Sequence, residues 1–126
     1  MKLKLEKGFD LSLELDGKEL IFKIYLTPQD KLELQKLADK IANVRNKLND
    51  DDSTASLTKA SKEIAKIYEN SLSVIFGDRK GELDSFLYHE GELDIALVEY
   101  LIYPILDKSV GASINQYSYV TENELS

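Results

Sequence analysis

The sequence contains no cysteine and no tryptophan, one histidine (His89), two prolines and six glycines. The absence of cysteine excludes disulfides, thiolate metal sites and cysteine nucleophiles. A single histidine excludes a metal site built on a histidine pair and any relay that needs a second imidazole. No stretch reaches the roughly 20 apolar residues of a membrane-spanning helix, and no apolar run follows the lysines near Met1. We therefore expect a cytoplasmic protein with no cofactor and no membrane partner.

The chain has 126 residues, which fits one domain, and 23 acidic against 16 basic residues give a net charge of −7. A protein that binds a phosphate backbone needs a positive field, so we expect no nucleic-acid partner. Glycine spacings typical of nucleotide-binding loops and a nucleophile elbow are also absent. The sequence therefore predicts that the protein is not an enzyme.

Two clusters of polar residues have a functional and a structural interpretation. The triplet Asp50-Asp51-Asp52 lacks the alternating oxygen ligands and final glutamate of a calcium loop, so a solvated loop is favoured over a metal site. His89 lies among acidic residues, but acid–base catalysis requires a cleft that shifts their pKa values. A structural role at a helix end near Gly91 is the favoured interpretation for His89.

The first 26 residues alternate between apolar and polar side chains, with an Asp16-Gly17 pair in the middle. Asp-Gly between two alternating runs predicts a β-hairpin with a type I′ turn, because both central residues of that turn need positive φ. Pairing Leu15 with Lys18 sets the register and places the apolar residues of both strands on one face. In this register Asp10 faces Lys23 on the other side of the hairpin.

Helical patterns follow the hairpin. The segment Thr27-Pro28-Gln29-Asp30 predicts a helix entry with Thr27 as the N-cap, and a second amphipathic helix is expected to end at Gly77. A short third helix is expected to close near Gly91. We predict an α+β fold: one domain over 1–116, with the hairpin at 1–26, three or four helices within 27–116 and a loose acidic tail at 117–126.

The segment from Leu93 to Leu106 is apolar on every side, which is typical of a helix buried centrally or at an interface. Pro104 is expected to kink or restart this helix. We predict a protein interface at Tyr100, Ile102 and Tyr103, because tyrosine offers large contact area with one polar group. The alternative is that the aromatic residues are half-buried core. The interface interpretation also predicts weak self-association.

The order of these segments resembles the tail assembly chaperones of long-tailed bacteriophages. The resemblance lies in the hairpin at Leu15-Asp16-Gly17-Lys18-Glu19-Leu20, in Ile75-Phe76-Gly77 at the end of the second helix, and in the short Leu83-Asp84-Ser85-Phe86-Leu87 segment. An apolar last helix with a polar, acidic tail is also similar.

The resemblance implies a cytoplasmic, non-enzymatic chaperone that coats the tail tape-measure protein, helps to recruit the tail-tube protein and is absent from the mature virion. It supplies no catalytic residues. The alternative is a small regulatory or structural adaptor, such as a phage-encoded inhibitor or a minor tail component. A neighbouring tape-measure gene and a slippery frameshift sequence near the stop codon would favour the chaperone.

Overall fold

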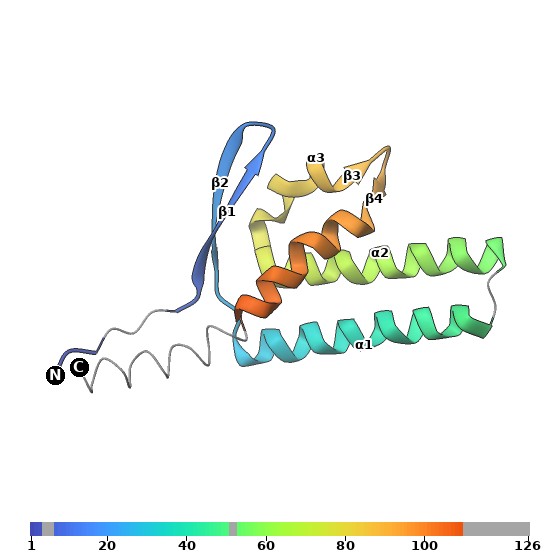
Figure 1. Cartoon of the computed structure of the whole chain (residues 1–126), viewed down its shortest axis with the longest axis horizontal. Coiled ribbons are helices and arrows are strands. Elements are labelled where there is room, and N and C mark those ends of the chain that lie inside the picture. The colour runs from blue at the N-terminus through green and yellow to red at the C-terminus, as the bar shows by residue number, and fades with distance from the viewer. Residues whose placement is uncertain (4–6, 51–52, 110–126) are drawn as a thin grey trace.

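A computed structural model describes residues 1–3, 7–50 and 53–109 (Figure 1). An N-terminal hairpin is followed by helices, so the predicted α+β class is confirmed. The predicted tail at 117–126 lies outside the described residues. In chain order the elements are β1 (Phe9–Leu15), β2 (Lys18–Ile24), α1 (Pro28–Asp50), α2 (Thr54–Phe76), the 3₁₀ helix η1 (Gly77–Leu83), α3 (Asp84–Leu87), β3 (Tyr88–His89), β4 (Glu92–Leu93) and a helix at residues 95–109.

The β1–β2 hairpin has the register that the sequence predicts. Leu15 pairs with Lys18 and Asp10 with Lys23, whose Nζ lies 3.6 Å from the Asp10 carboxylate. Asp16 and Gly17 have φ values of 48° and 78°, as a type I′ turn requires. The odd-numbered side chains of β1 and the even-numbered side chains of β2 therefore share one apolar face.

The helix α1 begins with the predicted cap. The Thr27 hydroxyl accepts a hydrogen bond from the Asp30 amide, and the Asp30 carboxylate accepts one from the Thr27 amide, each at 3.0 Å. This reciprocal pair is a capping box. The helix extends to Asp50, and α2 begins at Thr54 after the N-cap Ser53, so the connection is shorter than predicted. Asp51 and Asp52 lie outside the described residues.

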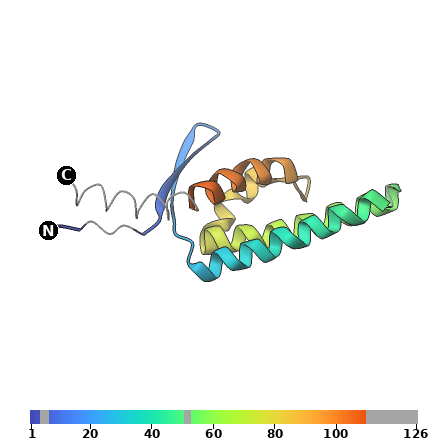
Figure 2. The same cartoon turned by 60° about the horizontal axis from the view of Figure 1, so that its bottom comes forward.

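The long helices α1 and α2 lie side by side and antiparallel, and the hairpin stands at the end where α1 begins (Figures 1 and 2). The helix at 95–109 packs against this pair. Residues of β2, α1, α2 and the 95–109 helix form one core, in which the aromatic rings of Phe22 and Phe76 meet edge to face with centroids 5.2 Å apart. No helix in the described ranges is long and apolar enough to cross a membrane.

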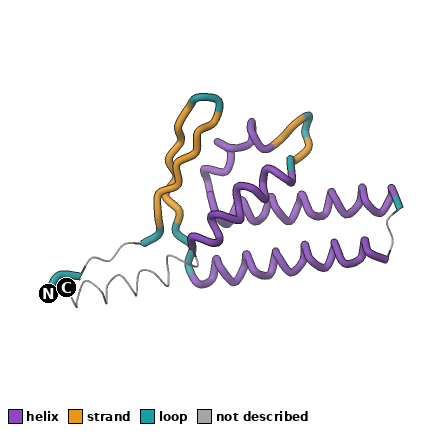
Figure 3. Tube along the Cα trace, viewed as in Figure 1, coloured by secondary structure: helices purple, strands orange, loops and turns teal. Residues whose placement is uncertain are grey.

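The segment between α2 and the 95–109 helix differs from the prediction. The helix α2 does end at Gly77, but a 3₁₀ helix replaces the expected turn, and α3 ends at Leu87 and not near Gly91. A second hairpin, β3–β4, follows (Figure 3). The chain reverses there because Glu90 and Gly91 adopt φ values of 55° and 82°. His89 therefore lies in a strand and not at a helix end.

The helix at 95–109 is buried on one side only, although its sequence is apolar on every side. Val98, Ile102 and Ile105 are at most 3% exposed, whereas Tyr100 and Tyr103 are 81% and 49% exposed. The reason is that α1 and α2 cover only one face. The helix starts two residues later than Leu93 and continues through Pro104 to residue 109, so the proline does not restart it.

Gly8 is required at the point where the chain enters β1. Its φ is +75°, and a Cβ at this position would lie 2.0 Å from the carbonyl oxygen of Ile24. We predict that Gly8→Ala lowers the free energy of unfolding by about 2 kcal/mol, since it adds backbone strain and a clash with main-chain atoms. Denaturant titration is the measurement. Gly81→Ala is the control: a Cβ there meets open space, so equal losses in both variants would contradict the prediction.

Candidate functional site

An apolar groove of about 480 Å³ lies between β1, α3 and the 95–109 helix. Side chains of three segments line it. They are Phe9, Leu11, Leu13, Glu14 and Leu15 from β1; Leu83, Phe86 and Leu87 from η1 and α3; and Leu97, Tyr100, Leu101, Pro104, Ile105 and Lys108 from the last helix.

The groove exists because the two strands of the hairpin are buried to different depths, although both pack against the core. On β2, Phe22 and Ile24 are 2% and 0% exposed. The four apolar residues of β1 share the same face of the sheet but are only half-buried, and no residue of β2 lines the groove. Half of the apolar face of the hairpin thus remains available beside the 95–109 helix. Such a surface is typical of a binding site.

Opposite charges lie toward the two ends of the groove. The Lys108 ammonium lies 5.3 Å from the centroid of the Phe9 ring, at the start of β1, and Glu14 lies near the end of that strand. Phe9 and Glu14 are five positions apart along the strand, which corresponds to about 17 Å. Among the described residues no ion pair involves Glu14, and its nearest cross-strand neighbour is Glu19. Glu14 alternates with Leu13 and Leu15, so its side chain lies on the polar face of β1, beside the groove and not within it.

The structure separates the three residues of the predicted interface. Tyr100 lines the groove and is the most exposed aromatic side chain among the described residues. Tyr103 is half-exposed, outside the groove, and its hydroxyl donates a 2.8 Å hydrogen bond to Glu99. Ile102 is 3% exposed and packs into the core, so its side chain is not available to a partner. Of the three residues predicted to form an interface, only Tyr100 lines the groove.

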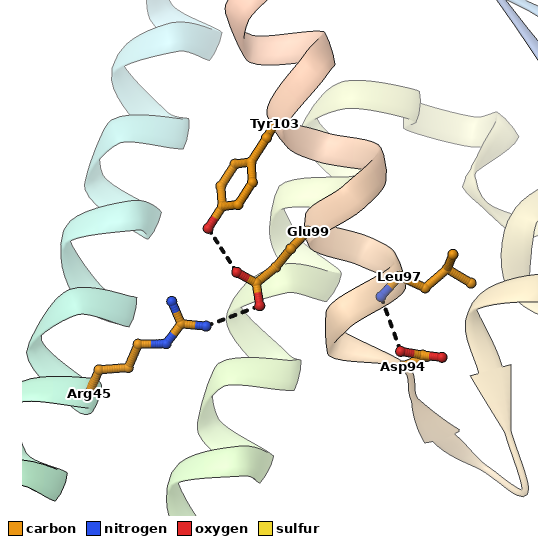
Figure 4. Close-up of polar contacts among 5 residues, drawn as sticks. All are labelled: Arg45, Asp94, Leu97, Glu99 and Tyr103. Atoms are coloured by element: carbon orange, nitrogen blue, oxygen red, sulfur yellow. Dashed lines mark hydrogen bonds and ion pairs between the residues drawn. The ribbon is translucent and has the colours of Figure 1, made fainter.

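A polar cluster holds the 95–109 helix against α1 (Figure 4). Glu99 accepts hydrogen bonds from Tyr103 and from Nη2 of Arg45, the latter at 3.1 Å. Burial raises the pKa of nearby Tyr68 well above its usual range, with further contributions from Tyr103 and Glu99. Tyr68 is therefore a neutral phenol at physiological pH. We interpret the cluster as a structural support for one wall of the groove.

Two further polar residues, Tyr88 and His89, lie in β3. The imidazole Nε2 of His89 lies 3.6 Å from the Asp94 carboxylate, on an exposed surface. Burial, with a hydrogen bond to Glu69, raises the pKa of Tyr88 to about 12. Across the described ranges no three His, Cys, Asp or Glu residues come together as a metal site. The arrangement can therefore bind apolar side chains, with the Lys108 ammonium at one end of the groove.

Sequence reasoning found Tyr100 but missed the β1 and α3 sides of the groove. The alternation of β1 was interpreted as a strand packed on the core, and nothing in it indicates which half of the sheet remains uncovered. The one available signal was the small size of a two-stranded sheet, which cannot cover its own apolar face. Comparisons with protein-family models, curated proteins and solved structures found no match to the chain.

Asp94 begins the helix that forms one wall of the groove. Its carboxylate Oδ1 accepts a 3.1 Å hydrogen bond from the Leu97 amide (Figure 4), and its carbonyl accepts one from the Val98 amide. We predict that Asp94→Ala lowers the free energy of unfolding by about 1 kcal/mol, because the helix loses its N-cap. Asp94→Asn is the matched control, since asparagine caps equally well. A loss as large in Asp94→Asn, measured by thermal denaturation, would contradict the capping role.

Proposed function

We propose that the protein is a non-enzymatic tail assembly chaperone that binds an apolar segment of a tape-measure protein in the groove beside β1 and helps to recruit tail-tube subunits. One observation carries the proposal. The surface of the protein has an apolar groove, and Tyr100 in the wall of this groove is 81% exposed. Leaving such surface uncovered has a cost in solubility, and holding a client is a function that requires it.

The charge of the chain also supports this proposal. A net charge of −7 keeps a complex with an apolar client soluble through mutual repulsion. The walls of the groove come from elements that are fixed by their own contacts. The Arg45–Glu99 pair holds the last helix, and the Phe22–Phe76 contact holds the hairpin. A preformed site of this kind binds without a large ordering cost.

Weak self-association through the exposed Tyr100 and Tyr103 of the last helix stays a prediction of the sequence. A chaperone must release its client to the growing tail, so its apolar surface has to be exchangeable. We propose that the protein acts in the cytoplasm of an infected host and is absent from the mature virion. Its genome should carry a tape-measure gene beside its own.

The test is co-production of this chain with the tape-measure protein from the same genome, followed by affinity measurement on the isolated complex. We predict that the double variant Leu97→Ser, Tyr100→Ser weakens binding about tenfold or more, because both side chains line the groove. Leu57→Ser is the matched control. Leu57 is 45% exposed, close to the 37% of Leu97, but lies at the start of α2 and away from the groove.

Equal binding by the double variant and the wild-type chain would remove the groove as the client site. A genome without a tape-measure gene, or a chain that leaves the tape-measure protein insoluble, would overturn the chaperone proposal. That result would favour the alternative of a small adaptor that contacts another protein.

A further inference from the structure

The two outer edges of the β1–β2 hairpin are not equivalent. In a hairpin with a two-residue turn, the pair next to the turn exchanges hydrogen bonds, and every second pair after it does the same. The intervening residues direct their N–H and C=O groups outward. From the register, these are Asp10, Ser12 and Glu14 on β1, and Glu19, Ile21 and Lys23 on β2.

The edge of β2 is occupied by the chain itself. The Ile21 carbonyl accepts a 2.6 Å hydrogen bond from Nη1 of Arg79. That guanidinium is held by Glu82 at 2.6 Å and lies 4.2 Å from the centroid of the Phe22 ring. The arginine therefore caps this edge at its centre and prevents another strand from pairing there.

Within the part of the chain that the structure describes, the edge of β1 carries no such cap. The sheet consists of β1 and β2, and within the described ranges no backbone hydrogen bond reaches the outward groups of Asp10, Ser12 or Glu14. The Ser12 hydroxyl bonds to Glu19 on the polar face, which leaves the Ser12 main chain unaffected. The groove described above lies along this same strand. An unpaired edge and an apolar groove thus meet at β1.

We infer that the occupant of the groove is an extended segment of a partner protein, which adds to β1 as a third strand. Its main chain pairs with the outward groups of Asp10, Ser12 and Glu14. Its alternate apolar side chains enter the groove against Leu97, Leu101 and Tyr100. The inference rests on the proposed function of the groove as a client site, and it adds the conformation and pattern of the client.

Charge decides between the possible strands. Asp10 and Glu14 lie on the polar face of β1, and Glu14 already faces Glu19. A lysine or arginine opposite Glu14 offsets the repulsion between Glu14 and Glu19, so the strand that fits alternates apolar with basic or neutral residues. Two copies of β1 paired antiparallel about Ser12 would place Asp10 of each beside Glu14 of the other. That repulsion disfavours a second copy of this chain.

The test uses the full chain and a synthetic seven-residue peptide that alternates leucine with lysine and threonine, with blocked ends. Amide hydrogen exchange is followed by NMR. We expect the exchange rates of the Asp10, Ser12 and Glu14 amides to fall about tenfold or more at saturating peptide. The amides of Glu19, Ile21 and Lys23, on the capped edge, should not change.

Two proline variants provide a second readout. Proline is tolerated on an edge strand where its missing N–H would face outward. Ser12→Pro should abolish peptide binding, and Ile21→Pro, its counterpart across the hairpin, should retain it. Loss of binding in both, or in neither, would overturn strand addition at β1. If either variant fails to fold, the protection of the β1 amides by peptide in the wild-type chain decides whether a strand is added at β1.

Other outcomes separate this inference from the proposed function. A helical peptide of the same composition that binds in place of the extended one would overturn strand addition and leave the groove as the client site. If neither peptide binds and the groove variants also bind the tape-measure protein normally, both proposals fail. Protection of the β1 amides that rises with protein concentration alone would identify a second copy as the occupant and overturn the assignment to a partner.

Discussion

The edge-to-face contact between Phe22 and Phe76 is the interaction on which the surface of this protein depends. It joins β2 to α2, and the Arg79 guanidinium lies over the same Phe22 ring. Because a two-stranded sheet is marginal without support, this contact both stabilises the hairpin and determines its tilt. The consequence is that β2 is buried more deeply than β1, whose half-buried apolar side chains line the groove. The edge and the apolar face of β1 therefore remain exposed for the same reason, which is the deeper burial of β2.

The parts of the fold that could be predicted from the sequence are those set by local chemistry. The period-two pattern and Asp16-Gly17 determine the hairpin register, since a slip by one residue would expose every apolar side chain. Likewise the Thr27–Asp30 capping box is a purely local device. The β3–β4 hairpin could not be predicted in the same way. Its strands have two residues each, too few for a pattern, and its turn depends on a glutamate, Glu90, in a left-handed conformation that few side chains adopt.

The candidate site was predicted only in part because it is a tertiary feature. Composition indicated that the last helix had more apolar surface than the chain could cover, and Tyr100 does remain exposed. Which side of that helix faces outward depends on how α1 and α2 pack beneath it, and this arrangement buries Ile102. The contributions of β1 and α3 arise from segments about 70 residues apart, which the hairpin tilt brings together. A sequence pattern predicts which face of a single element is apolar, but this groove forms only when several separate segments pack together.

The central claim is that a tape-measure protein contacts this chain in the groove beside β1. The most direct measurement replaces Tyr100 with a photo-reactive benzoylphenylalanine in cells that produce the tail proteins, and identifies the cross-linked products by mass spectrometry. Tyr25, 45% exposed and outside the groove, serves as the reference position. The account predicts adducts with the tape-measure protein from position 100 and none from position 25. Adducts of equal yield from both positions, or adducts with the tape-measure protein from position 25 alone, would contradict it.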